Sequence, residues 1–165
     1  MAVENKYVNA DIAAGELAPT RFSQGTKAIT VIQTFEVAAA DSDASVYRVF
    51  ANLPSTLVPI DLKVLNDAMT GSTDWDFGLY EPGVGGAEVS KALLADGLDL
   101  SSGHVVTTAL GGLSNVNISD LGKPLWELAG KTIQNRQASY DLAATANTVG
   151  SAAGTVTVIG TFLNP

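Results

Sequence analysis

The chain has 165 residues, no cysteine and a formal net charge of −8. Its length favours a single domain, the lack of cysteine excludes a disulfide framework and thiolate chemistry, and the acidic balance argues against nucleic acid as the main partner, because phosphate binding needs clustered basic residues. Hydrophobic residues make up 46% and charged residues only 16%, so the chain has ample material for a core and neutral surface that a partner could bury.

The first stretch, residues 1–27, shows no sustained hydrophobic periodicity, and Gly15, Pro19 and Gly25 interrupt it. We therefore predict an extended arm with at most one short strand, followed by a β-domain over residues 28–165. The arm either packs on its own domain or lies on a neighbouring subunit. Its candidate contact residues are Tyr7, Val8, Ile12, Leu17, Arg21 and Phe22.

Residues 29–39 and 46–53 come next and are predicted to be strands. In the first of them Ile29, Val31 and Phe35 alternate with threonines and a glutamate. Period-two alternation places one set of side chains on a buried face and the other toward solvent.

Residues 60–80 then predict a strand, a turn and a second strand, which we interpret as a hairpin with a heavy aromatic face. Ile60, Leu62 and Val64 are expected on the buried face of the first strand. In the second strand Trp75, Phe77 and Leu79 are expected to be buried. The residues expected to face water are Asp74, Asp76, Gly78 and Tyr80.

The middle of the chain is less regular. Residues 81–87, EPGVGGA, predict a flexible glycine-rich turn, and residues 88–94 fit either one helical turn or a strand. Short β-like runs are predicted at residues 104–109 and 116–118. Residues 123–130, KPLWELAG, predict a short helix that ends at a glycine.

The last third predicts two further strands, over residues 139–146 and 155–163. With seven or eight short strands and almost no helix, the chain is predicted to be all-β: a jelly-roll-like antiparallel β-sandwich with one short helix and an extended N-terminal arm. The residues expected to anchor its core are Trp75, Phe77, Leu79, Trp126, Tyr140 and Phe162.

The sequence contains no convincing catalytic set, so we predict that the chain is not an enzyme. It has one histidine, His104, and no G-x-S-x-G motif around a serine. The Gly83–Gly86 run lacks the lysine and hydroxyl residue that complete a phosphate-binding loop. A hydrolase in which His104 works with a serine, or in which two carboxylates act together, remains a weaker hypothesis.

No metal site or cofactor is predicted. With one histidine and no cysteine, zinc and iron sites are improbable. Calcium could use carboxylates at Asp41 and Asp43 or at Asp96 and Asp99, but the full ligand spacing of a calcium loop is missing. Asp74 and Asp76 beside Trp75 also permit a carbohydrate-binding face, although a solvated outer face is the simpler interpretation.

Several long runs resemble a known group of proteins. YRVFANLPSTLVPIDLKVLNDAMTGSTDWDFGLYEPG, LADGLDLSSG, LWELAG and YDLAATANTVGSAAGTVTV resemble segments of the capsid decoration, or cement, proteins of tailed bacteriophages. The resemblance covers roughly residues 46–158 and matches the arm least well.

The resemblance implies a jelly-roll-like protein on the outer capsid surface of a virion, made in the host bacterial cytoplasm. The resemblance also implies that the protein clamps neighbouring major capsid subunits and stabilises the head. Its partners are the major capsid protein and copies of itself, as a dimer or trimer, with no role for nucleic acid or a membrane. The alternative is a carbohydrate- or host-surface-binding β-sandwich module of the virion.

Overall fold

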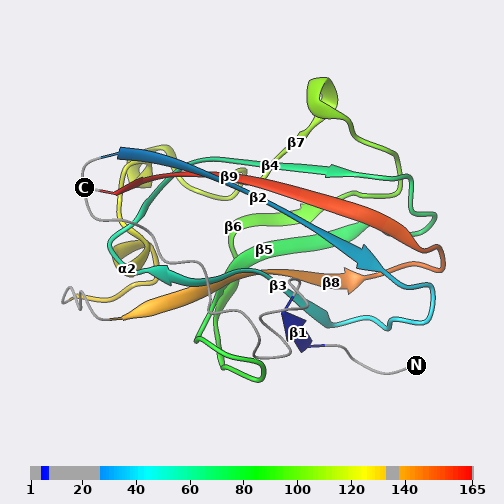
Figure 1. Ribbon diagram of the computed structural model, residues 1–165, viewed down its shortest axis with the longest axis horizontal. Coiled ribbons are helices and arrows are strands. Elements are labelled where there is room, and N and C mark those ends of the chain that lie inside the picture. Colours follow the sequence, from blue (N-terminus) through cyan, green and yellow to red (C-terminus); the bar gives the residue numbers. More distant parts are fainter. Residues whose placement is uncertain (1–4, 8–26, 133–137, 165) are drawn as a thin grey trace.

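Two β-sheets packed face to face form the molecule (Figure 1). The computed structural model describes residues 5–7, 27–132 and 138–164 of the chain. Within them, the five-stranded sheet has the order β1-β3-β8-β5-β6 and the four-stranded sheet the order β2-β9-β4-β7. The strands are β1 (Asn5–Tyr7), β2 (Lys27–Val37), β3 (Ser45–Pro54), β4 (Val58–Asn66), β5 (Asp74–Tyr80), β6 (Glu88–Leu98), β7 (Leu110–Gly111), β8 (Ser139–Thr148) and β9 (Gly154–Asn164).

The eight strands from β2 through β9 pair in a nested order, in which the first strand pairs with the last. β2 pairs with β9, β3 with β8, β4 with β7 and β5 with β6, each pair antiparallel. The chain thus follows the path of one long hairpin wrapped around a sandwich, which is the topology of a jelly roll. The predicted all-β sandwich is confirmed, and β1 adds a ninth strand, parallel to β3 at the edge of the five-stranded sheet.

The predicted hairpin at residues 60–80 is wrong. Its two strands, β4 and β5, lie in different sheets, where β4 pairs with β9 and β7 and β5 pairs with β8 and β6. The connection crosses the end of the sandwich and is fixed there by fully buried Met69, whose N–H donates to the Leu100 carbonyl. Alternation finds the strands but does not say which strands pair.

Two predicted burial patterns in this region are also wrong. Ile60 is 50% exposed, while Leu62 and Val64 are buried, because the register of β4 against β9 shifts between Pro59 and Asp61 and turns Ile60 outward. In β5, Asp76 and Tyr80 are buried together with the aromatic face, since β5 lies inside the sheet and its outer face is covered as well.

In the middle of the chain the structure settles one open alternative, corrects two predictions and confirms one. Residues 88–94 form a strand, and β6 continues to Leu98. The β-like runs expected at 104–109 and 116–118 are instead short 3-10 turns at Val106–Thr108 and Ile118–Asp120. The predicted helix is confirmed as the single turn α2 (Leu125–Leu128), with Pro124 at its N-cap position.

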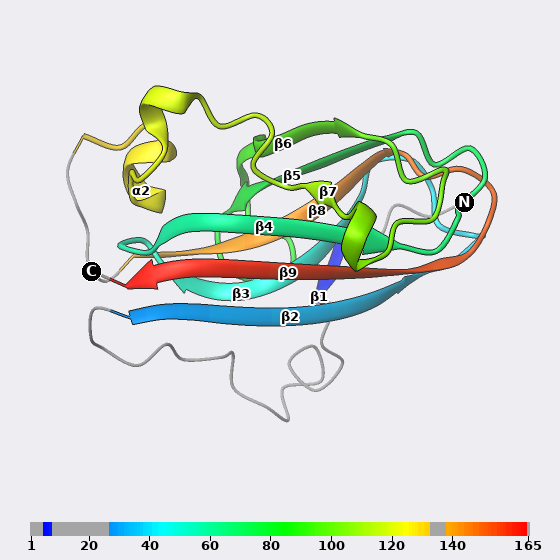
Figure 2. The ribbon, with the colours of Figure 1, turned by 90° about the horizontal axis from the view of Figure 1, so that it is seen from above.

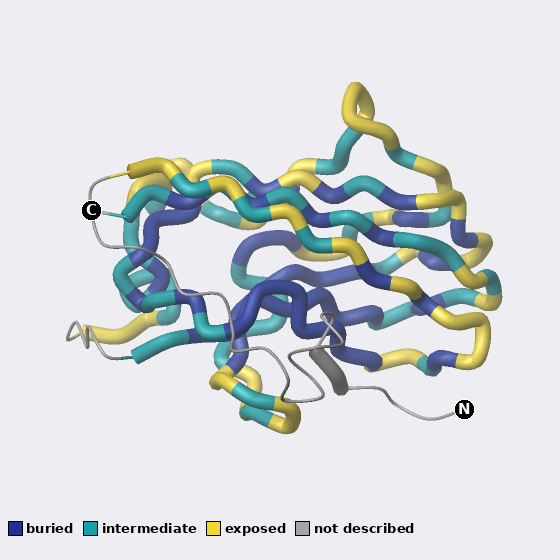
Figure 3. The backbone as a smooth tube through the Cα atoms, in the orientation of Figure 1, coloured by how far each residue is buried: buried dark blue, intermediate teal, exposed yellow. Residues whose placement is uncertain are grey.

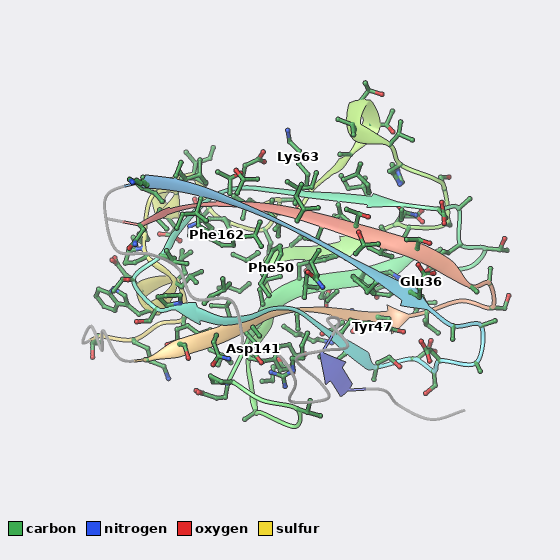
Figure 4. All side chains as sticks on the ribbon, viewed as in Figure 1. Glu36, Tyr47, Phe50, Lys63, Asp141 and Phe162 are labelled. Carbon is green, nitrogen blue, oxygen red and sulfur yellow. The ribbon has the colours of Figure 1, made fainter. Side chains whose placement is uncertain are left out.

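Aromatic side chains from both sheets fill the core, among them Tyr47, Phe50 and Phe162 (Figure 4), and Figure 3 shows buried residues along strands of both sheets. Tyr47 stacks between Phe35 and Trp75, with ring centroids 4.9 and 5.6 Å away, and Phe50 meets Phe162 edge to face. Of the expected core anchors, five are at most 4% exposed: Trp75, Phe77, Leu79, Tyr140 and Phe162. Trp126, on α2, is half-buried and packs against the margin of this core.

Candidate functional site

The loop that joins β5 to β6, residues 81–87, projects from the side of the sandwich on which β1 lies (Figure 1). Its tip carries Val84, whose side chain is 57% exposed. The loop begins and ends close together, since the Glu81 N–H donates to the Ala87 carbonyl over 2.8 Å. An apolar side chain held out on a closed loop is a surface that a protein partner could bury.

A buried ion pair holds this loop against the sheet. Arg48 on β3 and Asp141 on β8 approach to 3.3 Å, and both side chains are fully buried. The Arg48 guanidinium also donates to the carbonyls of Glu81 at 2.7 Å and Gly86 at 2.8 Å, so it binds both ends of the loop. Figure 4 shows Asp141 at the base of the loop, on the side of the sheet.

The Asp141 carboxylate accepts hydrogen bonds from three different residues. Besides Arg48, it accepts hydrogen bonds from the N–H of Gly83 at 3.0 Å, within the loop, and from the N–H of Asn52 at 2.8 Å, on β3. A buried carboxylate needs such partners, because burying a charge is costly unless the charge is paired and hydrogen-bonded. The pair therefore fixes the loop position from below at three points of its backbone.

The glycines make this arrangement possible. Gly83 and Gly85 have φ values of +99° and +84°, which side chains rarely adopt. A Cβ atom on Gly86 would lie 2.1 Å from the Glu81 carbonyl oxygen, so only glycine permits the tight return of the chain. The GVGG run is thus a positioned loop, rather than the flexible turn predicted from its composition.

Tyr80 completes the support beneath the loop. The Arg48 guanidinium carbon lies 4.7 Å from the centre of the Tyr80 ring, and the Tyr80 hydroxyl is 2.7 Å from the Thr145 hydroxyl. Burial raises the pKa of Tyr80 above its ordinary value, so the phenol stays neutral. The pairing of β1 brings Tyr7 opposite Arg48, so the described part of the arm and the loop meet at one residue.

Of the arm residues expected to make contacts, Tyr7 belongs to β1, which pairs with β3 of its own chain. The others fall outside the described residues: Val8, Ile12, Leu17, Arg21 and Phe22. The sequence prediction missed Arg48 and Asp141. The available signal was a single charge within each of two strongly apolar strands, YRVF and YDLAA, where a solvated face would carry several polar residues.

His104 has a structural partner. The Asn66 amide nitrogen donates to the carbonyls of Asp67, Leu100 and Ser102, so its oxygen faces the His104 ring and accepts from Nδ1 at 2.9 Å. Asn66 and His104 also exchange both backbone hydrogen bonds. The histidine therefore fastens the segment after β6 to β4, and no serine hydroxyl is hydrogen-bonded to it among the described residues.

The carboxylates considered for calcium are engaged in turns. Asp41 accepts from the Ala38 N–H and the Tyr47 hydroxyl, Asp43 accepts from the Val149 N–H, and Asp99 accepts from the N–H two residues on. Across the part of the chain that the structure describes, no group of three histidine or acidic side chains is placed to hold a metal ion.

Asp76 and Asp96 form a carboxylate pair on the outer side of β5 and β6. Burial would raise the pKa of Asp76, but hydrogen bonds from Asn147 at 2.7 Å and from the Gly97 N–H at 3.0 Å, with Lys91 nearby, hold it below the ordinary value of 3.8. The hydrogen bond with Asp76, and the charge of that residue, raise the pKa of Asp96. The Asp76 carboxylate is therefore engaged by its own neighbours.

The aromatic platform expected of a carbohydrate-binding face is missing from the described surface. Trp75 is fully buried and donates from Nε1 to the Ser72 hydroxyl at 2.6 Å, and Tyr80 is 5% exposed. The exposed large apolar side chains there are all aliphatic: Ile32, Ile60, Val84, Val105, Val106, Ile118 and Leu121. Trp126 is only half-buried, but it packs against the core.

A cavity of about 150 Å³ lies between β6 and the segment around α2. Lys123 lies on its wall and is paired with Asp120 at 2.9 Å and with Glu127 at 3.4 Å, so the positive charge of the lysine is already compensated within the cavity. No described helix is long and apolar enough to span a bilayer. The loop clamped by Arg48 and Asp141 is therefore the best-built candidate site on the described surface.

Comparison with known proteins supports the fold. No protein-family model and no curated protein matches the sequence. A chain from the capsid of Ralstonia phage GP4 has the same fold, with a TM-score of 0.58 and 15% identity over 90% of this chain and 91% of that one. A chain from the capsid asymmetric unit of cyanophage Pam1 has a TM-score of 0.51 and 17% identity over 90% and 93%. At these identities the likeness concerns the fold alone.

Proposed function

We propose that this chain is a structural virion protein that binds the outer surface of a phage capsid and clamps neighbouring major capsid subunits, which stabilises the head. The observation that carries the proposal is that 90% of the chain is similar in fold to two chains that come from phage capsid structures. The resemblance of the sequence to capsid decoration proteins points the same way. The role requires no catalysis and no cofactor.

The clamped loop suits this role. Its backbone is held by the Arg48–Asp141 pair before any partner arrives, so little conformational entropy is lost when Val84 is buried against a capsid subunit. The arm is the second proposed contact, because its described strand β1 lies on the same side of the sandwich as the loop (Figure 1). Two contacts would allow the protein to bridge two capsid subunits.

Weak individual contacts are enough for such a protein. Repetition of the capsid lattice and association of the protein with copies of itself add avidity, which multiplies modest site affinities. The low content of charged residues, 16%, leaves neutral surface that can be buried at small desolvation cost.

The test is co-sedimentation of the purified full chain with capsids that lack it. Val84→Asp should weaken binding about tenfold, because a buried valine contributes about 1.5 kcal/mol or more and a charge replaces it. Val106→Asp is the matched control, since Val106 is 73% exposed on a tip that lies on the opposite side of the sandwich (Figure 1). Equal binding of all three proteins would contradict the loop contact.

The arm contact has its own test. A chain that lacks residues 1–26 keeps β2 intact, because this strand begins at Lys27. We expect such a chain to occupy capsids less completely than the full chain. Unchanged occupancy would remove the arm from the proposal and leave the loop as the binding element.

A further inference from the structure

The two sheets have four edges, and these edges differ in how well they are protected from pairing with a strand of another molecule. β1 occupies the β3 edge, and β7 has only two residues. The β6 edge is interrupted by register shifts against β5, and Asn115 covers it by donating from its backbone to the Leu94 carbonyl and from its side chain to the Ala92 carbonyl. Bulges, short strands and covering segments are the usual means by which proteins prevent pairing between sheet edges.

The β2 edge has none of these devices among the described residues. β2 is eleven residues long, pairs with β9 along its whole length without a register shift, and contains no proline. It is the outermost described strand of its sheet (Figure 2). Alternate residues of an antiparallel edge strand direct their backbone N–H and C=O groups away from the sheet, so β2 offers a row of donors and acceptors that no other described strand pairs with.

The outward face of β2 is symmetric about its centre. Five residues of β2 form this face: Ala28, Thr30, Ile32, Thr34 and Glu36. The Thr30 and Thr34 hydroxyls pair with the hydroxyls of Thr161 and Thr157 on β9, at 3.1 and 2.9 Å, and Ile32 lies opposite Ile159 between them. The centre of this face therefore has the same order, threonine, isoleucine and threonine, in both directions along the strand.

We propose that β2 pairs antiparallel with β2 of a second copy of this chain, centred on Ile32. In this register all eleven residues find a partner. Thr30 faces Thr34 of the second copy and Ile32 faces its own counterpart, so the rows of threonine and isoleucine continue across the join. A two-fold interface requires a surface that is complementary to itself, and this face has that property.

The charges of β2 favour the same arrangement. Lys27 begins the strand and Glu36 lies next to its end, as Figure 4 shows for Glu36. Antiparallel pairing sets Lys27 at the same end of the joined strands as Glu36 of the second copy, on the other face of the sheet, whereas parallel pairing would bring each charge next to its own counterpart, which is destabilising. On the inward side, half-exposed Ile29 would meet Phe35 of the second copy and lose its remaining contact with water.

The pairing is independent of capsid binding and is tested on the free full chain. Sedimentation equilibrium should show a reversible dimer. Ile32→Lys sets two lysines opposite each other at the centre and should weaken the dimer at least tenfold. Ile60→Lys is the matched control, because Ile60 is similarly exposed, 50% against 60%, on β4 of the same sheet and away from the edge. It should leave the dimer unchanged.

Single cysteines test the register, since the natural chain contains none. On mild oxidation with copper phenanthroline, Ile32→Cys should form a cross-linked dimer, because directly opposite residues lie about 4.5–5.5 Å apart, within reach of a disulfide. Thr30→Cys should not, as the two cysteines would lie about 14 Å apart along the strands. A monomeric wild-type chain, or equal cross-linking at both positions, would overturn the proposal. A monomer whose Ile32→Lys variant loses capsid binding would assign the edge to a capsid strand instead.

Discussion

Removal of the Asp141 carboxylate should both destabilise the fold and release the candidate binding loop. In Asp141→Ala the guanidinium of Arg48 remains fully buried without its counter-charge, 3.3 Å away in the native chain. The N–H groups of Asn52 and Gly83 also lose the acceptor that they share. Arg48 keeps the carbonyls of the loop as acceptors, but carbonyl oxygens carry no net charge.

The size of the effect follows from these contacts. Breaking a buried ion pair by removal of one partner costs about 3–5 kcal/mol, because an uncompensated charge stays in the interior. For a chain of this length, that loss corresponds to a melting temperature lower by about 6–20 °C. Asp61→Ala is the control: its pair with Lys63 has the similar distance of 3.4 Å, but both side chains are half exposed, so the expected loss is below about 1 kcal/mol.

Denaturant unfolding of the three proteins, followed by tryptophan fluorescence, measures these differences. The Arg48→Met and Asp141→Leu double variant should be less destabilised than Asp141→Ala, since no unpaired charge remains. Capsid binding should nevertheless fall in this double variant, because the loop has lost its attachment to the sheet. A loss below about 1 kcal/mol in Asp141→Ala, or full capsid binding by the double variant, would refute the view that this pair holds a functional loop.

Three further predictions concern smaller sites. Gly86→Ala should reduce capsid binding, because its Cβ would collide with the loop backbone, whereas Gly111→Ala, which has open space around it, should bind normally in the same sedimentation assay. Asp96→Asn should raise the melting temperature at pH 7, because Asp76 disfavours the charged form of Asp96 and so raises the pKa of Asp96. The gain in melting temperature should vanish as the pH falls below 3.8, since the native Asp96 carboxyl is then protonated as well. His104→Ala should cost about 1 kcal/mol through its lost hydrogen bond and leave capsid binding intact, and any loss of a hydrolytic activity in this variant would instead support an enzyme.

Alternation predicted the strands best where one face is buried and the other is solvated. β9 shows this plainly, since Val156, Val158 and Phe162 are buried and the threonines between them are not. Alternation gave the wrong result for β5, where Asp76 and Tyr80 are buried too, because a strand inside a sheet with both faces covered has no solvent-exposed face. The exposed Ile60 depends on a register shift that only the partner strand reveals.

The candidate site was harder to predict than the fold. The loop was visible in the sequence as a glycine-rich run, but its rigidity depends on Arg48 and Asp141, which are 93 residues apart in the chain. The assignment of β4 and β5 to separate sheets has the same origin, because pairing is decided by contacts that are distant in sequence. The symmetric sequence of β2 can be seen before the structure is known, but it suggests pairing with a second copy only once β2 is known to be an edge strand.

The most direct test of the proposed role is the number of copies of this chain in each purified particle, measured by quantitative electrophoresis against the major capsid protein. A protein that clamps neighbouring capsid subunits over the whole head should be present in a copy number comparable with that of the capsid protein itself, and its removal should leave heads that open at lower temperature. A protein present in only a few copies, or absent from the particle, would contradict the account.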